Sequence, residues 1–272
     1  MPDVIPAKAG IQNGWFSGFP IKSGMTANKK NMATSKQKLR WKRVVLKLSG
    51  ETFGGKGRFG LDADAVRYIA AEVKAAADLG VQVAIVVGGG NFIRGEKLSQ
   101  IGIDRATADY MGMLGTIMNA MALQSMLETK GLYTRVMSTI TAIHVAEPFI
   151  RRRAIRHLEK GRVVIFSGGT GSPYFSTDTA AALRASEINA EAILKATNVA
   201  GVYEEDPKQN HKAKLLKEID AMDVVRRGLR VMDLTAVTLA RENRIPVIVF
   251  DAFQKGNLKR LLQGEKIGSE VK

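Results

Sequence analysis

The chain contains no cysteine, no long apolar run and, after residue 40, no linker rich in proline or serine. The absence of cysteine excludes disulfides, thiolate nucleophiles and cysteine-ligated zinc, and it fits a reducing compartment. No apolar run approaches the roughly 18 residues that a membrane span requires, so we expect no membrane association. Residues 41–272 show no repeat of fixed period either, so we expect them to form a single domain.

Acidic residues are scarce relative to basic ones, with 26 Asp and Glu against 41 Lys and Arg and a formal net charge of +15. About half of this excess lies in residues 1–43, which hold nine Lys or Arg and one acid, Asp3. A second basic cluster lies in residues 151–162. This cluster is either the solvated face of a helix or a surface for polyanions, so a nucleic-acid-binding regulator is one alternative function.

Residues 1–40 show neither helical nor alternating periodicity, because glycine or proline interrupts every short apolar run. We expect them to form a poorly ordered basic N-terminal extension. Met25 and Met32 are both candidate start residues. Mass spectrometry of the natural protein would identify its true N-terminus.

Strand-like and helix-like segments alternate from residue 42 onward. The strand candidates are residues 44–48, 81–87, 134–138, 163–166, 192–195 and 246–250, several of them apolar throughout. One helix is expected after Asp62. A second is expected at residues 111–127, where we expect the apolar side chains to fill the core (Met111, Met113, Leu114, Ile117, Met118, Met121 and Met126). This pattern predicts an α/β fold with a mostly parallel central sheet covered on both faces.

A glycine-rich stretch with several hydroxyl side chains, residues 167–178, follows one strand candidate and precedes a helix candidate at 179–187. Exposed backbone N–H groups, hydroxyls and a helix N-terminus together form an anion cradle, most simply for phosphate. An ordinary glycine-rich turn is the alternative. The glycine stretches at 50–60 and 88–90 also follow strand candidates, so the loops can converge on one site. Residues 50–57 differ from a P-loop because Gly57 replaces the magnesium-binding Ser or Thr.

Five charged residues interrupt or flank apolar segments: Lys47, Arg94, Asp109, Lys195 and Asp233. Each alone is compatible with helix capping or with a long side chain that reaches solvent. As a set, together with the glycine loops, they supply the cations and carboxylates that phosphoryl transfer needs. Catalysis of that reaction consists mainly of positioning and electrostatic stabilisation.

Seven segments in a fixed order strengthen this interpretation: residues 47–51, 88–95, 109–113, 169–178, 194–197, 201–207 and 231–234. Together they resemble bacterial-type uridylate (UMP) kinases of the amino-acid-kinase family. The resemblance implies a three-layer α/β/α sandwich, with an acceptor-binding lobe at about residues 41–190 and an ATP-binding lobe at about 191–272. It also implies the reaction ATP + UMP → ADP + UDP in pyrimidine nucleotide biosynthesis, with Mg²⁺ bound mainly through phosphates and no dedicated protein ligand.

The resemblance assigns roles to individual residues by position. The catalytic set would be Lys47, Lys195, Asp233 and Asp178, with the lysines neutralising the transferring phosphoryl group and Asp233 orienting them. Asp178 would be a partner either of the lysines or of hydrated Mg²⁺. ATP would be bound by Lys47, Leu48, Ser49, Gly50, Gly90, Arg94, Thr197, Tyr203 and Asp206. UMP would be bound by Gly89, Asp109, Thr170, Gly171, Ser172, Pro173, Tyr174, Phe175, Ser176 and Thr177.

The resemblance also implies a cytoplasmic homohexamer that does not require nucleic acid, with GTP and UTP as effectors. Gly55, Lys56, Gly57, Arg58, Phe59 and Gly60 match a segment that responds to GTP in some members. Asn198 and Ala200 stand where many members carry Lys and Asp, which bears on regulation and ATP contacts. Two alternatives stay open: a kinase of the same fold with a carbamate or carboxylate acceptor, and a catalytically silent nucleotide sensor.

Overall fold

The computed structural model describes residues 39–272 apart from a few internal positions, which are Arg58, residues 94–97, Ser99, Asp206, Lys208, His211, Arg230 and the side chain of Lys56. The predicted N-terminal extension therefore lies almost wholly outside the described residues. From residue 39 onward the described residues form one compact unit. The predicted division into two lobes near residue 190 stays a prediction.

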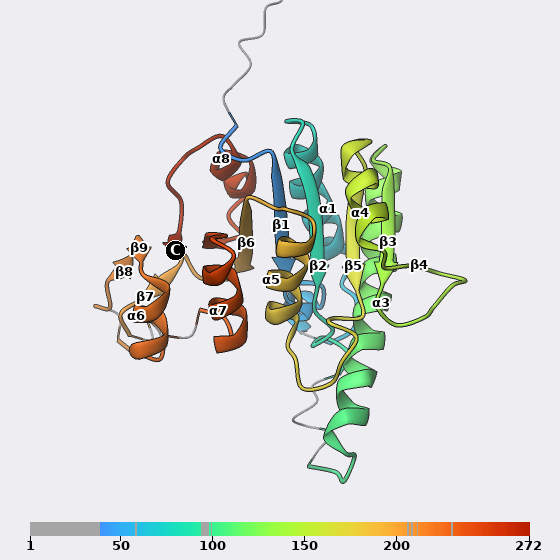
Figure 1. The fold of residues 1–272 in the computed structure, drawn as a ribbon, viewed down its shortest axis with the longest axis horizontal. Coiled ribbons are helices and arrows are strands. Elements are labelled where there is room, and N and C mark those ends of the chain that lie inside the picture. The colour runs from blue at the N-terminus through green and yellow to red at the C-terminus, as the bar shows by residue number, and fades with distance from the viewer. Residues whose placement is uncertain are drawn as a thin grey trace, which may run out of the picture. The chain divides into compact units, whose positions relative to one another are not determined.

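A nine-stranded sheet runs through the middle of this unit (Figure 1). Its order is β4-β3-β5-β2-β1-β6-β10-β11-β9, and among these described pairs only β10–β11 is antiparallel. The strands are β1 (Arg43–Leu48), β2 (Gln82–Val87), β3 (Thr134–Ser138), β4 (Glu147–Pro148), β5 (Val163–Ser167), β6 (Ala192–Thr197), β9 (Glu218–Ile219), β10 (Val247–Asp251) and β11 (Ser269–Val271). A separate ribbon pairs β7 (Val202–Tyr203) with β8 (Leu215–Leu216). The predicted mostly parallel sheet is confirmed.

Helices cover both faces of the sheet, which confirms the predicted three layers (Figure 1). One face carries α1 (Ala63–Ala77), α3 (Arg105–Thr129) and α8 (Asn257–Leu262). The other carries α4 (Arg151–Glu159), α5 (Thr177–Glu187) and α7 (Leu234–Glu242), with α6 (Ala221–Arg226) against α7. Among the described helices, none combines the length and the apolar character that crossing a bilayer requires.

Strand β1 shows how the two apolar cores arise from alternation. Val44, Leu46 and Leu48 belong to the core beneath α1 and α3, whereas Val45 belongs to the core beneath α4 and α5. Lys47 has the same parity as Val45, so its side chain leaves the strand on the α5 face. Because β1 is a central strand and helices cover both faces of the sheet, its side chains are buried on both faces, which explains why Val44, Val45, Leu46 and Leu48 are apolar.

Helix α3 is longer and less buried than the sequence predicted. It begins at Arg105, capped by Asp104, rather than at residue 111. Met113 and Ile117 are buried as expected, but three side chains assigned to the core are 52%, 43% and 40% exposed (Leu114, Met118 and Met121). The interpretation as core filling is therefore wrong for these three. The physical reason is that only one side of the helix packs against the sheet, and its apolar residues are not confined to that side.

Candidate functional site

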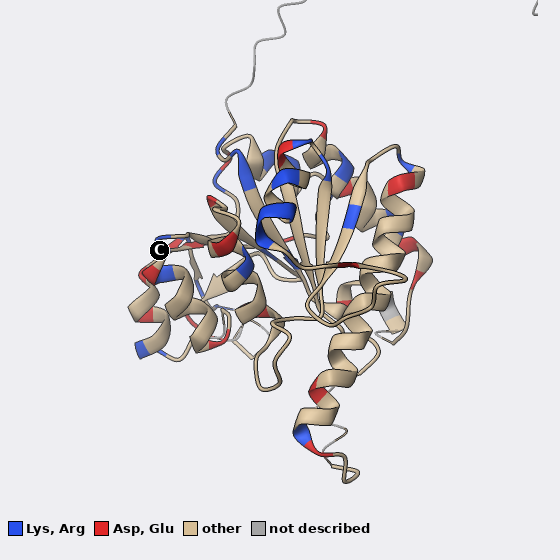
Figure 2. Ribbon diagram, turned by 45° about the vertical axis from the view of Figure 1, so that its right-hand side comes forward, with Lys and Arg blue, Asp and Glu red and all other residues tan. Residues whose placement is uncertain are grey.

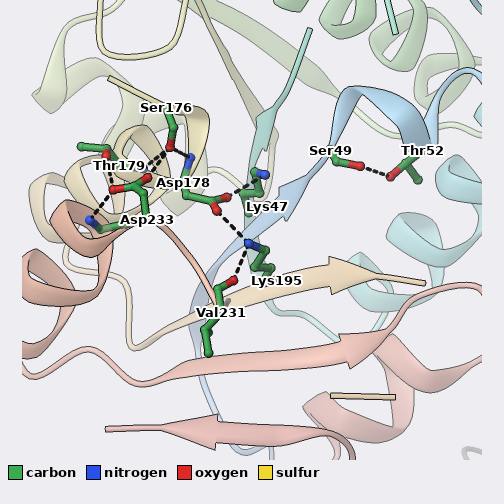
Figure 3. Close-up of polar contacts among 10 residues, drawn as sticks. Lys47, Ser49, Thr52, Ser176, Asp178, Thr179, Lys195, Val231 and Asp233 are labelled. Atoms are coloured by element: carbon green, nitrogen blue, oxygen red, sulfur yellow. Dashed lines mark hydrogen bonds and ion pairs between the residues drawn. The ribbon is translucent and has the colours of Figure 1, made fainter. Parts of the chain in front are cut away.

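Two lysines and one aspartate form a largely buried charged cluster at the carboxyl edge of the sheet. Lys47 of β1 and Lys195 of β6 are direct partners in the parallel register, so their side chains leave the sheet side by side. Asp178, in the first turn of α5, lies between them (Figure 3). Its Oδ1 is 2.6 Å from Nζ of Lys47, and its Oδ2 accepts a hydrogen bond from Nζ of Lys195 at 2.7 Å. Lys195 also donates to the carbonyl of Val231 at 2.5 Å.

Burial and mutual charge shape the ionisation of this cluster. Burial alone would raise the pKa of Asp178, but the ammonium groups of Lys47 and Lys195 hold it below its usual value. Burial lowers the pKa of Lys195, Lys47 lowers it further, and Asp178 opposes both influences. With all three groups ionised, the cluster carries one unmatched positive charge, which suits it to an anionic ligand such as a phosphate.

Asp233 supports the cluster indirectly. Its Oδ1 accepts hydrogen bonds from the backbone N–H of Ala236 and the hydroxyl of Thr179, both at 2.9 Å, and its Oδ2 accepts one from the hydroxyl of Ser176 (Figure 3). Ser176 in turn caps α5 by accepting from the N–H of Asp178 at 2.9 Å. The sequence predicted that Asp233 orients the lysines. In the structure Asp178 makes the direct contacts to both, and Asp233 fixes the start of the helix that carries Asp178.

The glycine loops after β1 and β2 meet next to the lysines. A Cβ atom built on Gly50 would lie 2.3 Å from the backbone nitrogen of Gly90, so no other residue fits there without moving the loop. Leu48 is buried at the end of β1, and the hydroxyl of Ser49 lies 3.0 Å from that of Thr52. The structure therefore brings together the predicted ATP-binding residues of these two loops, while Arg94 lies outside the described residues.

The loop between β5 and α5 carries most of the residues predicted to bind UMP, and α3 holds it in place. Asp109, in the second turn of α3, accepts a hydrogen bond from the backbone N–H of Tyr174 at 2.8 Å. Arg105 donates to both carboxylate oxygens of Asp109 at 3.0 Å. Tyr174 and Phe175 are 69% and 50% exposed, which leaves their rings accessible to a ligand. Asp109 and the loop, far apart in the sequence, are thus neighbours in space.

The residues predicted to contact adenosine are less closely grouped. The hydroxyl of Thr197, at the end of β6, lies 2.8 Å from the carbonyl oxygen of Val199 and 3.0 Å from that of Phe250, so its one hydrogen is shared between them. A cleft of about 1050 Å³ extends from the two lysines past Ser49 to Thr197 and Asn198. Tyr203 lies on the β7–β8 ribbon and does not line this cleft. Asp206 lies outside the described residues.

The loop predicted to respond to GTP begins with a short 3₁₀ turn at Gly55–Gly57. Its last residue, Gly60, donates its N–H to the carbonyl of Asn91 at 2.9 Å, which ties the loop to the glycine stretch after β2. The ring of Phe59 is 77% exposed. Arg58 and the side chain of Lys56 lie outside the described residues, and the role of this loop stays a prediction.

Two other predictions concern metals and the basic cluster of residues 151–162. In the described part of the chain, no three His, Asp or Glu side chains gather as a metal site would require. Two arginines of α4 have acidic neighbours: Arg153 lies 3.8 Å from Glu147 of β4, and Arg156 lies 3.6 Å from Glu159 of the same helix. Charged residues of both signs are scattered over helices and loops (Figure 2). Acidic neighbours therefore offset part of the positive charge of the cluster.

Sequence reasoning missed several polar groups that hold the site together. They are the carbonyl of Val231 and the side chains of Asn91, Thr116 and Asn119. The three side chains are almost fully buried. A usable signal was present, because Thr116 and Asn119 are polar residues three positions apart in an otherwise apolar stretch of α3.

Comparison with known proteins agrees with this geometry. The family model described as "Amino acid kinase family" matches residues 42–251. The crystal structure of UMP kinase from Bacillus anthracis is 42% identical with a TM-score of 0.83, covering 85% of this chain and 96% of that chain. The crystal structure of UMP kinase from Ureaplasma parvum is 35% identical with a TM-score of 0.79, covering 86% of this chain and 99% of that chain. That of uridylate kinase from Archaeoglobus fulgidus is 28% identical with a TM-score of 0.66, covering 84% of this chain and 99% of that chain.

Proposed function

Because the chain belongs to the amino acid kinase family and resembles solved UMP kinases over nearly their whole length, we propose that it transfers the γ-phosphoryl group of ATP to UMP. The observation that carries this proposal is the cluster of Lys47, Asp178 and Lys195, where the glycine loops meet the loop before α5. A kinase of an acid acceptor and a silent sensor are not favoured, because the similar solved structures are UMP kinases and both lysines are present.

The two lysines would stabilise the transferring phosphoryl group. Its transition state spreads negative charge over several oxygens, so two adjacent ammonium groups lower its free energy more than that of the ground state. Asp178 favours the charged form of Lys195 and would hold the two amines close together until the nucleotide arrives. The attacking oxygen belongs to the UMP phosphate, which is already anionic, so this reaction needs no general base. Bound phosphates would also counteract the effect of burial and raise the pKa of Lys195.

The remaining predicted residues would hold the two nucleotides in line. We assign the ATP phosphates to Lys47, the backbone of residues 48–50, Gly90 and Arg94, and the adenosine part to Thr197, Tyr203 and Asp206. We assign UMP to Gly89, to Asp109, whose carboxylate suits ribose hydroxyls, and to residues 170–177. The contact between Asp109 and Tyr174 supports this assignment, because it places the ribose and phosphate contacts of one ligand next to each other.

The available donors fit a metal ion that arrives with ATP. The nearest carboxylate, Asp178, already faces two ammonium groups, so phosphate oxygens would supply most ligands of Mg²⁺. When bound, Mg²⁺ would add positive charge beside the transferring group.

We further propose, from the family resemblance, a cytoplasmic homohexamer in pyrimidine nucleotide biosynthesis, activated by GTP through residues 55–60 and inhibited by UTP.

An acceptor screen tests the proposed function. Purified full-length protein is mixed with ATP and Mg²⁺, and ADP release is measured with UMP, CMP, carbamate, acetylglutamate or aspartate as acceptor. We expect UMP to give the highest kcat/KM. Turnover with one of the acids and none with UMP would refute the assignment. Tight DNA binding with a steep salt dependence, in a protein that turns over no acceptor, would favour the regulator instead.

A further inference from the structure

Two buried polar side chains of α3 have no direct part in the proposed reaction. Thr116 is 2% exposed and Asn119 is 0% exposed, so neither can touch a bound nucleotide. They lie three residues apart and therefore project from the same side of the helix. Burying a polar group costs free energy unless it is hydrogen-bonded, so the partners of these two side chains show what they hold.

Asn119 holds the glycine loop that follows β2. Its amide nitrogen donates to the carbonyl of Gly88 and to Oδ1 of Asn91, both at 2.7 Å. Asn91 returns a hydrogen bond to Oδ1 of Asn119 at 3.0 Å and donates to the carbonyl of Gly60 at 2.6 Å. Since Asn91 is 1% exposed, this pair of amides forms a buried link from α3 to two loops.

The same loop presses directly against the backbone of α3. A Cβ atom built on Gly89 would lie 2.3 Å from the carbonyl oxygen of Gly112 and 3.0 Å from the backbone nitrogen of Thr116. The loop therefore cannot move toward the helix, and the hydrogen bonds of Asn119 oppose its movement away. Its position relative to α3 is fixed in both directions.

Thr116 holds the loop that follows β5. Its hydroxyl oxygen accepts a hydrogen bond from the N–H of Gly168 at 2.7 Å and donates to the carbonyl of Met113 at 2.6 Å. The carbonyl of Gly168 accepts from the hydroxyl of Thr139 at 2.7 Å, so both sides of this residue are held. Two turns earlier on α3, Asp109 holds the same loop at Tyr174.

We propose that Thr116 and Asn119 are positioning residues that set the spacing between the loop at 88–91 and the loop at 168–177. The proposal rests on the proposed function, in which these loops hold the phosphates of the two nucleotides. One helical turn separates the two side chains, and a helix is stiff over that length. The spacing matters because each loop must present its donors within hydrogen-bonding distance of its own nucleotide, so a displaced loop weakens the binding of that nucleotide.

Steady-state kinetics of the full-length protein test the proposal, with Thr116→Val as the main variant. Valine keeps the shape of threonine but leaves the N–H of Gly168 unpaired. We expect KM for UMP to rise about tenfold, the effect of one lost buried hydrogen bond, with KM for ATP unchanged. Thr116→Ser keeps the hydroxyl and should restore KM for UMP. For Asn119→Asp we expect both KM values to rise, because Gly89 and Gly90 face both nucleotides.

Thr129→Val is the matched control, because Thr129 is on the same helix and bonds to the carbonyl three residues earlier, yet touches neither loop. Thr129→Val should leave kcat and the KM values for UMP and ATP unchanged. Equal increases of both KM values in Thr116→Val would overturn the proposal. A fall in kcat alone would also overturn it, because a variant that merely folds less stably has a smaller active fraction and therefore a lower kcat. Hydrogen exchange separates a failure of this proposal from a failure of the proposed function. Thr116→Val should speed exchange of the Gly168 N–H even if the wild-type protein fails to phosphorylate UMP. Unchanged exchange there would also overturn the proposal.

Discussion

Replacing Asp178 with asparagine tests the charged cluster most directly. Asparagine has nearly the same shape but leaves two ammonium groups beside a neutral amide. At an effective dielectric constant of about 20, each contact of 2.6–2.7 Å corresponds to about 6 kcal/mol of attraction before desolvation is subtracted. Desolvation cancels much of this, and breaking a buried pair costs about 3–5 kcal/mol in practice. We therefore expect Asp178→Asn to lose about 3 kcal/mol of transition-state stabilisation, which lowers kcat about a hundredfold.

The charge of Asp178 also determines how kcat and the free energy of unfolding should depend on pH. Asp178 raises the pKa of Lys195, so removing its charge lowers that pKa further. We therefore expect kcat of Asp178→Asn to fall with rising pH at values where wild-type kcat is still constant. The free energy of unfolding of the wild-type protein should fall at acid pH as Asp178 becomes protonated. The folded-state pKa of Asp178 is lowered, so its contribution is present above the unfolded-state pKa of about 3.9 and is lost as pH falls through the folded-state value.

Two measurements check these expectations: kcat as a function of pH, and urea unfolding between about pH 3 and 6, where the variant should lose less stability than wild type. Asp223→Asn is the matched control. Asp223 also lies in the first turn of a helix, but it is half-exposed and pairs with Arg226 at 3.7 Å on the surface. Wild-type kcat and an unchanged pH profile in Asp178→Asn would refute the role of the cluster.

Other substitutions separate the functions of the remaining residues. Lys47→Ala and Lys195→Ala should each lower kcat by about a hundredfold or more, as single-turnover kinetics would show, and near-normal turnover in both would contradict the mechanism. Asp109→Ala should raise KM for UMP with little change for ATP, and an equal rise for both would show that the acceptor site is misplaced. Burial, together with Glu72 and Asp251, raises the pKa of Tyr68 to about 12, so absorbance titration should show a late-ionising tyrosine that disappears in Tyr68→Phe.

Much of the fold followed from local patterns in the sequence. Six apolar runs identified six strands of the sheet, because a strand buried on both faces has few positions for polar residues. The exceptions to that pattern were equally informative. Lys47 and Lys195 stood out as charged residues near the ends of buried strands, and the structure places them in register with each other. The glycine loops could be recognised because they follow strand ends.

Other features were decided by contacts between distant parts of the chain. Asp178 and Asp233 were both predicted as partners of the lysines, and the sequence could not show which of them lies between the two amines, because that depends on how α5 and α7 pack on the sheet. Nor could it show which side of α3 is exposed, since its apolar residues surround the helix.

Local patterns were enough to predict six of the nine strands of the sheet, the glycine loops and the charged residues at strand ends, because periodicity and local conformation act over a few neighbouring positions. The contacts among these residues come from the folded chain: Lys47 meets Lys195 through strand register, and the packing of α3 brings Asp109 to Tyr174 and Asn119 to Asn91. The physical reason is that these distances depend on strand pairing and helix packing across the whole unit, and no short segment contains that information.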